Sequence, residues 1–191
     1  MWKLVIFDLG ETLIDFNLTG RWYEMLKEQA IPKMFQALKA KYQGYSPQTI
    51  PFQQFQTIAY EALSRAHNPQ SMRERVKEYF KYFRVPFKTD LIETQVEAWF
   101  ESMKPYPKIY PDTIPVLEEL SKRESITLSL WSDTPFQTPG IYIEKFMEQF
   151  SIRQYFDSVY FSGDHGLRKP NPETIQKIHD KYQVPYKDMV Y

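Results

Sequence analysis

Val5-Ile6-Phe7-Asp8-Leu9-Gly10-Glu11-Thr12-Leu13 places a carboxylate directly after an apolar run that begins at Leu4. The run from Leu4 to Phe7 is typical of a strand buried on both faces, and a glycine-containing turn follows it. In open α/β sheets, active sites form at the carboxyl ends of the strands. Asp8 at such an end can act as a nucleophile or bind Mg²⁺, or it can simply cap the next segment in solvent.

The composition indicates a folded protein without thiol chemistry. The chain has 191 residues, 24 Lys plus Arg, 24 Asp plus Glu and no cysteine. A net charge of zero gives no electrostatic reason to expect a nucleic-acid partner, and the lack of cysteine excludes disulfides and thiolate metal sites. The amino-terminal apolar run is far shorter than the roughly 18 residues of a membrane span. We therefore expect a soluble, cytoplasmic monomer or homodimer without a membrane partner.

The spacing of apolar residues predicts an all-helical domain over residues 16–105. One helix carries Trp22, Leu26 and Ala30, and a second begins near Pro32. Three more are predicted by apolar repeats within residues 52–66, 72–83 and 92–103. Breaks are expected at Gly44-Tyr45-Ser46-Pro47 and at His67-Asn68-Pro69. This pattern favours a helical bundle inserted after the first strand.

Residues 106–191 alternate between helical and strand patterns. Strands are predicted at 126–131 and 158–161, with another beginning at 189, and helices at about 113–122, 143–150 and 172–182. The proline-rich passage 105–111 is predicted to be a hinge or linker. We therefore expect residues 1–15 and 106–191 to form one α/β domain, a Rossmann-like three-layer sandwich with a parallel sheet.

Polar groups also follow the later strands. Ser132 and Asp133 come after the second strand, and Arg168 and Lys169 precede a helix start at Pro172. A lysine beside a helix amino terminus attracts an anion through its charge and through the oriented backbone amides. By itself, Ser132 could simply satisfy a turn amide, and an isolated Arg-Lys pair is more often solvated surface, but three strand ends with complementary groups favour an active site.

In this order the residues resemble the haloacid dehalogenase-like (HAD) hydrolase superfamily along essentially the whole chain. Asp8 with Thr12-Leu13 matches the family's first motif, Ser132 matches the second, and Lys169 before Pro170-Asn171-Pro172 matches the third. The helical insertion directly after the first motif resembles the family's cap domain of the first type, here residues 16–105.

The resemblance implies that Asp8, Ser132 and Lys169 are catalytic in a Mg²⁺-dependent phosphatase acting on a small phosphorylated metabolite. Asp8 would form an aspartyl-phosphate, and Thr12, Ser132, Asp133 and Lys169 would bind the phosphate. Mg²⁺ would be held by Asp8, by the backbone carbonyl of Gly10 and by an acid at the end of a final strand.

Two departures from the family pattern affect this expectation. Gly10 stands where the family has a second aspartate, so the carbonyl for the metal remains but the general acid is missing. The side chain of Glu11, one residue further on, should point in another direction and is not expected to replace that acid. Esters with poor leaving groups should therefore react slowly.

The second departure is at the carboxyl end, where Tyr191 stops two or three residues before the expected metal-binding acid, and Asp188 lies before the last strand. We therefore expect a truncated chain, with impaired metal affinity and turnover if the molecule ends there.

Two other functions remain open. A 2-haloacid dehalogenase would use Asp8 on carbon without a metal, with Arg21 as a possible anchor for the substrate carboxylate. Asp133 and Gly10 depart from the usual pattern of that group.

The other alternative is a non-catalytic relative that would bind a ligand or a protein through an aromatic-rich cap, in which one helix carries Tyr79, Phe80, Tyr82 and Phe83. Packing inside the bundle is the commoner reason for such crowding.

Overall fold

The computed structural model describes residues 2–42, 50–64 and 71–191, and the chain divides into two compact units. Unit 1 combines Met1–Phe16 with Pro107–Tyr191, and unit 2 is Asn17–Tyr106. The expected boundaries differ from these by one residue at each crossing, because Phe16 belongs to unit 1 and Tyr106 to unit 2. The expected breaks at 44–47 and 67–69 lie outside the described residues.

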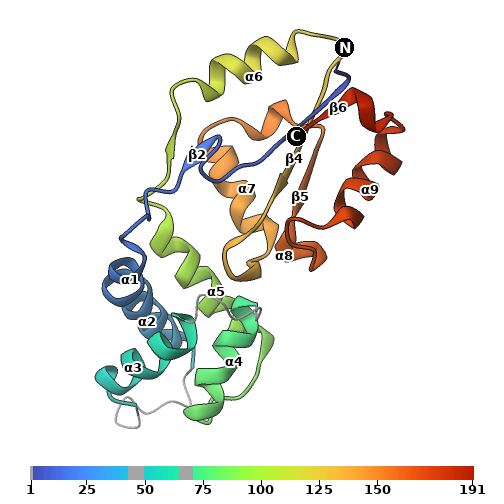
Figure 1. Ribbon diagram of the computed structural model, residues 1–191. Helices are drawn as coiled ribbons and strands as arrows, with labels where there is room; N and C mark the ends of the chain where they lie inside the picture. Colours follow the sequence, from blue (N-terminus) through green and yellow to red (C-terminus); the bar gives the residue numbers. More distant parts are fainter. Residues whose placement is uncertain (1, 43–49, 65–70) are drawn as a thin grey trace. The chain divides into compact units, whose positions relative to one another are not determined.

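A four-stranded parallel sheet forms the centre of unit 1 (Figure 1). The strand order is β5-β4-β1-β6, with β1 at Leu4–Phe7, β4 at Thr127–Ser132, β5 at Ser158–Phe161 and β6 at Met189–Val190. Leu4 pairs with Thr127 on one side and with Met189 on the other. The strands all run the same way, so their carboxyl ends share one edge, as the predicted α/β fold requires. The prediction of a parallel-sheet α/β fold is confirmed.

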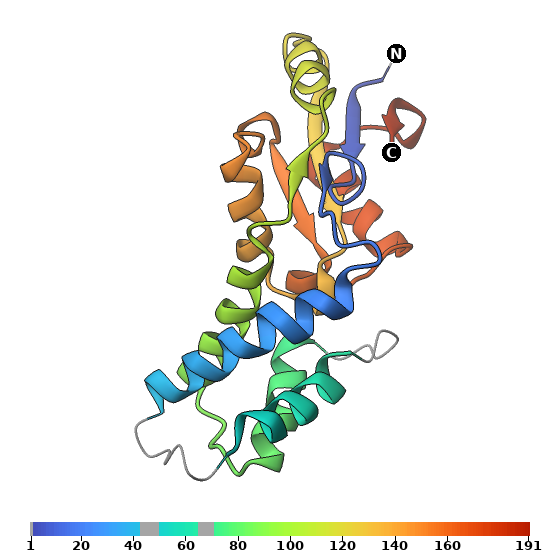
Figure 2. The same cartoon turned by 90° about the vertical axis from the view of Figure 1, so that its left-hand side faces the viewer.

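Helices cover both faces of this sheet. Helix α7 (Gly140–Gln149) and helix α9 (Pro172–Tyr182) lie on opposite sides of it (Figures 1 and 2). On the α9 side, Leu4, Ile6 and Trp131 form a buried cluster with Ile178. Alternate residues of β1 face the other way, and there Phe7 meets Phe156 edge to face with ring centroids 6.0 Å apart. The remaining helical elements of unit 1 are α6 (Thr113–Ser121), α8 (Ser162–His165) and single 3₁₀ turns at Pro135–Gln137, Arg153–Tyr155 and Tyr186–Asp188.

A small antiparallel ribbon also belongs to unit 1. Strand β2 (Ile14–Asp15) pairs with β3 (Lys108–Ile109), and Ile14 lies opposite Ile109. The sequence predicts a hinge or linker over 105–111, and this is wrong for 108–109. Two-residue strands are too short to give a period-2 pattern. The pairing joins the end of the first motif to the point where the chain re-enters unit 1.

The secondary structure of unit 2, over its described residues, consists of helices joined by turns. Its elements are α1 (Trp22–Glu24), a π-helical segment (Met25–Ala30), α2 (Ile31–Lys41), α3 (Phe52–Leu63), α4 (Met72–Tyr82) and α5 (Thr89–Met103). The first three follow one another without a gap, so the two helices expected before and after Pro32 are one helical run. In the π-helical pattern the amide of Ile31 bonds the carbonyl of Leu26, and the missing amide of Pro32 leaves the Lys27 carbonyl available. The Gln56 side chain donates to that carbonyl at 3.2 Å.

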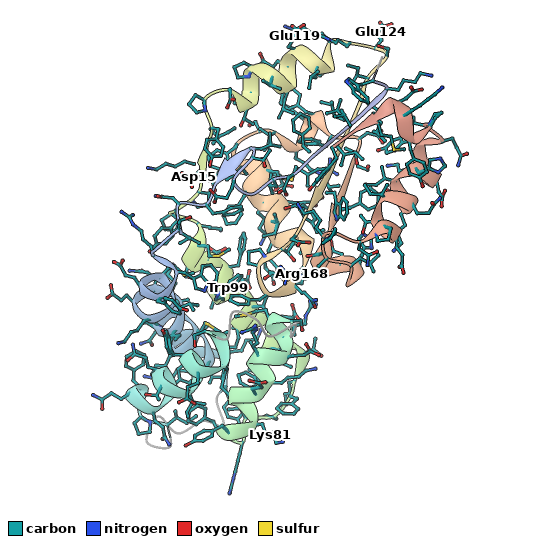
Figure 3. The ribbon with its side chains drawn as sticks, in the orientation of Figure 1. Asp15, Lys81, Trp99, Glu119, Glu124 and Arg168 are labelled. Carbon is teal, nitrogen blue, oxygen red and sulfur yellow. The ribbon has the colours of Figure 1, made fainter. Side chains whose placement is uncertain are left out.

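Aromatic side chains fill the interior of unit 2. Trp99 of α5 lies inside the unit, whereas Lys81 of α4 projects from it (Figure 3). Of the aromatic residues of α4, Tyr79 and Phe80 are fully buried and Tyr82 is largely exposed, at 55%. The crowding of aromatic residues on α4 is therefore mainly packing. Among the described residues, no helix combines the length and the apolar character needed to cross a membrane.

Candidate active site

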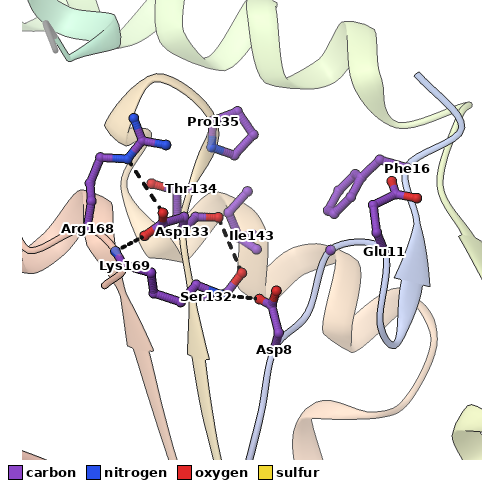
Figure 4. Close-up of a pocket in the computed structure, with 11 residues that line it drawn as sticks. Asp8, Glu11, Phe16, Ser132, Asp133, Thr134, Pro135, Ile143, Arg168 and Lys169 are labelled. Carbon is purple, nitrogen blue, oxygen red and sulfur yellow. Dashed lines mark hydrogen bonds and ion pairs between the residues drawn. The ribbon is translucent and has the colours of Figure 1, made fainter. Parts of the chain in front are cut away.

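A cavity of about 470 Å³ opens in unit 1 at the carboxyl edge of the sheet (Figure 4). The residues that line it come from the turn after β1, from the segment after β4 and from the loop before α9. They are Asp8, Gly10, Glu11, Phe16, Ser132, Asp133, Thr134, Pro135, Ile143, Arg168 and Lys169. The position agrees with the general rule for open α/β sheets.

Asp8 directly follows β1 and is half-buried in this cavity. Its Oδ1 accepts a hydrogen bond from its neighbour, the Leu9 amide, at 2.7 Å. The same oxygen lies 2.7 Å from Nζ of Lys169. Since both contacts are made to Oδ1, neither engages Oδ2. Asp8 therefore holds a fixed orientation while one carboxylate oxygen stays available for chemistry.

The turn after Asp8 is closed by backbone hydrogen bonds. The carbonyl of Leu9 accepts from the amides of Leu13 and Ile14 at 2.9 and 3.0 Å, and the Glu11 amide donates to the Ile14 carbonyl at 2.8 Å. These hydrogen bonds involve the Leu9 carbonyl and the Glu11 amide, on either side of Gly10, but not the Gly10 carbonyl. That carbonyl and the Asp8 carboxylate are hard oxygen donors, which suits Mg²⁺ completed by water and a substrate phosphate. These two oxygens are part of the donor set that the sequence resemblance implies, but the acid of a final strand is not among them, and the described residues contain no group of three or more His, Cys, Asp or Glu side chains that could hold a metal ion.

The side of Gly10 that a side chain would occupy is already filled by an aromatic ring. A Cβ at residue 10 would lie 3.3 Å from Cε2 of Phe16, a tight contact. Phe16 itself packs edge to face against Phe146 of α7, with ring centroids 5.6 Å apart. Glu11, beside Gly10, has a positive φ of 59°. One wall of the cavity is therefore apolar.

The carboxylate of Glu11 is engaged away from Asp8. Its Oε2 accepts a hydrogen bond from the hydroxyl of Tyr110 at 3.3 Å, and Figure 4 shows the carboxylate turned away from Asp8. Burial raises the pKa of Tyr110 above its ordinary 10.0, and the negative charges of Glu11 and Asp15 raise it further. Tyr110 therefore stays protonated as the donor of this bond.

Ser132 stands at the carboxyl end of β4 and is buried, with its hydroxyl at the cavity wall. Its Oγ donates only a long bond, 3.3 Å, to the Asp133 carbonyl. The next residues are fixed by α8, because the Thr134 amide donates to Ser162 Oγ at 2.9 Å. Gly163 permits this approach, since a Cβ there would overlap the Thr138 carbonyl. The Ser132 hydroxyl can thus turn to a ligand without disturbing the loop.

Asp133 ties the segment after β4 to the loop before α9. Its Oδ1 accepts from the Lys169 amide at 3.1 Å, and its Oδ2 lies 3.5 Å from Nε of Arg168. Both carboxylate oxygens are therefore occupied by the backbone and the side chain of that loop. These contacts favour a role in positioning Lys169 over the direct phosphate contact expected from the sequence.

Lys169 connects Asp8 with the end of β6. Its Nζ donates to the hydroxyl of Tyr191 at 2.9 Å, and Tyr191 packs against Trp131 with ring centroids 5.6 Å apart. Burial acts to lower the pKa of Lys169, but hydrogen bonds to Asp8 and Tyr191 and the charge of Asp8 outweigh it, so the pKa lies above the ordinary 10.5. Lys169 is therefore held as a cation beside Asp8.

Most of the residues selected from the sequence lie together around this cavity. Asp8, Gly10, Ser132, Asp133 and Lys169 all line it. Thr12 does not. It lines a neighbouring hollow of about 350 Å³ that also contains Asp8, Val190 and Tyr191.

The start of α9 and Asp188 lie outside the cavity, and several residues near it were not selected from the sequence. Asn171, which caps α9, and Pro172, its first residue, face another hollow of about 390 Å³, so the start of that helix is not part of the cavity wall. Asp188 precedes β6 and pairs with Lys3 at 3.6 Å, at the amino end of the sheet. Phe16, Pro135, Ile143 and Tyr191 were not selected as site residues, because no chemical motif marks them.

The comparisons with known proteins agree with this architecture. A family model described as a haloacid dehalogenase-like hydrolase matches residues 2–191. A search of curated proteins gave no match. Among solved structures, the chain is similar to a 2-haloacid dehalogenase from Pseudomonas syringae pv. Tomato DC3000, with 20% identity and a TM-score of 0.59, covering 99% of this chain and 76% of that one.

Two further solved structures have the same fold. One is described as the HAD-hydrolase YfnB from Bacillus subtilis bound to magnesium, with 14% identity, a TM-score of 0.54, and coverage of 98% of this chain and 76% of that chain. The other is a predicted phosphoglycolate phosphatase from Haemophilus somnus 129pt, with 15% identity, a TM-score of 0.52, and coverage of 98% and 75%. At these identities the likeness shows the fold alone. With the family model matching nearly its whole length, the chain is a hydrolase that belongs to the haloacid dehalogenase-like hydrolase family.

Proposed function

We propose that this hydrolase is a Mg²⁺-dependent phosphatase that acts on a small phosphorylated metabolite through a phosphorylated Asp8. The single observation that carries the proposal is the contact of 2.7 Å between Lys169 Nζ and Asp8 Oδ1 in a cavity that Ser132 also lines. A cation beside the attacking carboxylate offsets the repulsion between that carboxylate and an anionic phosphate.

The residues of unit 1 have complementary roles in this proposal. Asp8 attacks phosphorus, and the bond from phosphorus to the leaving oxygen breaks with its electron pair going to that oxygen. Ser132 and Lys169 donate hydrogen bonds to the phosphoryl oxygens, and Thr12 is a further candidate donor. Water then attacks the aspartyl-phosphate, and Asp8 recovers its carboxylate. The helical unit 2 is proposed to act as the cap, which limits water access and selects the substrate.

The metal would be held by the Asp8 carboxylate and the Gly10 carbonyl. When bound, Mg²⁺ supplies charge neutralisation for the phosphate. The proposal is supported by the oxygen donors that the turn presents.

Hydrolysis of p-nitrophenyl phosphate tests this function. Nitrophenolate departs without needing a proton, so the assay reports on the nucleophile even where no general acid is present. We expect turnover with Mg²⁺, loss of turnover with a chelator, and loss in Asp8→Asn, whose amide is a poor nucleophile of almost the same shape. No phosphatase activity, together with Asp8-dependent halide release from a 2-haloacid, would contradict the proposal and favour a dehalogenase. Absence of both activities would favour a binding protein.

A further inference from the structure

The Asp8 cavity has room for more than a phosphate group. Its volume of about 470 Å³ lies within the range of roughly 300–1,000 Å³ that is usual for small-molecule sites. In the proposed function Asp8, Ser132 and Lys169 hold the phosphate, so the organic part of the substrate lies against the rest of the wall. The side chains of that remaining wall therefore decide which organic group fits.

Three apolar side chains stand in the remaining wall. Phe16 follows strand β2, Pro135 belongs to the segment after β4, and Ile143 lies on helix α7. Figure 4 shows the ring of Phe16 directed toward the side of the cavity on which Pro135 and Ile143 lie. All three belong to unit 1. The fold of this unit therefore gathers apolar groups from three separate segments beside the nucleophile.

The charged side chains of the same wall have partners within the protein. Oδ2 of Asp133 lies 3.5 Å from Nε of Arg168. Oε2 of Glu11 accepts a hydrogen bond from Tyr110, and the carboxylate is turned away from the nucleophile. The apolar side chains are therefore the better candidates to contact the organic part of a substrate.

The ring of Phe16 is held in place by its neighbours. It packs edge to face against Phe146 of α7, with ring centroids 5.6 Å apart, and it lies against Gly10. Phe16 is nevertheless only half-buried, so part of the side chain remains open at the cavity wall. A side chain that packing already holds loses little conformational freedom when a ligand covers it.

We infer that Phe16, Pro135 and Ile143 form a subsite for an apolar group, so that the preferred substrates are phosphates of apolar, above all aromatic, alcohols rather than of sugars or polyols. The inference rests on the proposed phosphatase function and names its substrate class. A phenyl group would bury apolar surface against all three side chains and would pack on the Phe16 ring. The hydroxyl groups of a sugar would lose water there, and none of the three side chains offers them a hydrogen bond.

Binding of phosphonates tests the subsite without relying on turnover, because their carbon–phosphorus bond resists hydrolysis. Calorimetric titration with Mg²⁺ present compares methylphosphonate, benzylphosphonate and 3-phosphonopropionate, whose second anion would instead favour Arg168. Benzylphosphonate should bind at least about tenfold more tightly than methylphosphonate, since even one methylene in an apolar pocket is worth about 10–200-fold. Tighter binding of 3-phosphonopropionate than of benzylphosphonate would overturn the inference.

Replacement of Phe16 shows whether its ring provides this preference. Phe16→Ala should remove most of the difference between benzylphosphonate and methylphosphonate, while the affinity for methylphosphonate stays nearly unchanged. Phe16→Leu keeps an apolar side chain and should keep part of the difference, which covers the case that the alanine variant does not fold. Phe87→Ala is the matched control, because Phe87 is 55% exposed, lies in unit 2 and does not line the cavity. Equal weakening of both phosphonates by the Phe16 variants would show a purely structural role and overturn the inference.

Two further measurements place the ring beside the phosphate site. Lys169→Met should weaken both phosphonates by a similar factor, because both present the same anionic group. If it left benzylphosphonate binding unchanged, the ring would bind elsewhere and the inference would be wrong. For p-nitrophenyl phosphate, Phe16→Ala should raise KM by about tenfold and change kcat much less, as expected for an interaction made equally with substrate and transition state. A fall in kcat with KM unchanged would contradict this role.

The outcomes separate the two proposals. If p-nitrophenyl phosphate is hydrolysed in an Asp8-dependent way but the wild type binds both phosphonates equally, the phosphatase function stands and the apolar subsite is overturned. If hydrolysis is absent but benzylphosphonate binds with the Phe16 preference, the phosphatase function is wrong and the subsite stands as a binding site. If neither phosphonate binds, the subsite is overturned as well.

Discussion

Nζ of Lys169 lies 2.7 Å from Oδ1 of Asp8, and the two residues are 161 positions apart in the chain (169 − 8). The pair places a cation where a phosphate would meet the attacking carboxylate. Replacing Lys169 with Met keeps the length of the side chain and removes the charge. We expect kcat/KM for p-nitrophenyl phosphate to fall by roughly 10²–10³-fold, as when a single donor to the transition state is lost.

Lys169→Arg is the control for charge. It keeps the cation but changes its shape, so it should recover part of the activity. Activity of Lys169→Met equal to that of the wild type would rule out an electrostatic role for this residue.

The same ion pair predicts how stability depends on pH. The pKa of Lys169 is raised above 10.5 in the folded protein, so the folded state binds this proton more tightly than the unfolded state. Its stabilising contribution is complete below the unfolded pKa and is lost as the pH rises through the folded pKa. Urea unfolding of the wild type and of Lys169→Met should differ more at about pH 9 than at about pH 11. A gap that grows at the higher pH would contradict this sign.

Asp133 should act through Lys169 rather than on the substrate. Asp133→Ala removes both contacts to the 168–169 loop, and a displacement of Lys169 by about 1 Å can cost up to about 10²-fold in kcat/KM. Asp133→Asn keeps an acceptor for the Lys169 amide and should lose much less. Because the change is in positioning, kcat should fall more than KM rises. An equal loss in both variants, mainly in KM, would instead show direct contact with the substrate.

Unit 2 offers a separate prediction about stability. Arg75 of α4 is fully buried, and its Nη1 donates to the carbonyls of Ala62 and Leu63 at the end of α3, at 3.0 and 3.2 Å. Arg75→Met leaves these carbonyls without that donor and should lower the free energy of unfolding by about 2–3 kcal/mol. Chemical denaturation measures the change.

Arg73→Met is the matched control for Arg75. Arg73 pairs with Glu93 at 2.5 Å, and both side chains remain partly exposed, at 46% and 33%. Surface ion pairs contribute less than about 1 kcal/mol, so this variant should change stability far less. If the two variants lost the same free energy, burial of Arg75 would not be the cause.

The sequence was sufficient to predict which polar residues gather around the Asp8 cavity, because their positions depend on local patterns. Apolar runs mark buried strands, and the residue that follows each run must lie at the shared edge of a parallel sheet. This reasoning brought Asp8 and Ser132 to one cavity, and the helix start at Pro172 pointed to Lys169, which lines the same cavity. The helices in the described parts of 18–103 were equally accessible, since a 3.6-residue period over several turns is a strong signal.

What the sequence could not predict depends on contacts between distant residues. No pattern indicates that Phe16 covers the space beside Gly10, or that Tyr191 bonds Lys169, because each contact arises only when the sheet and loops come together. The β2–β3 ribbon is too short to have a period, and the π-helical segment before Pro32 follows from one missing amide within a continuous apolar repeat.

The most direct test of this account is to trap the covalent intermediate. The protein is mixed with acetyl phosphate and Mg²⁺, treated with borohydride, and digested for mass spectrometry, since borohydride reduces an aspartyl-phosphate to homoserine. We predict homoserine at position 8 after incubation with acetyl phosphate and none in the untreated protein or in Asp8→Asn. Turnover of acetyl phosphate with no reduction at residue 8, or with reduction at a different aspartate, would contradict the assignment of Asp8 as the nucleophile.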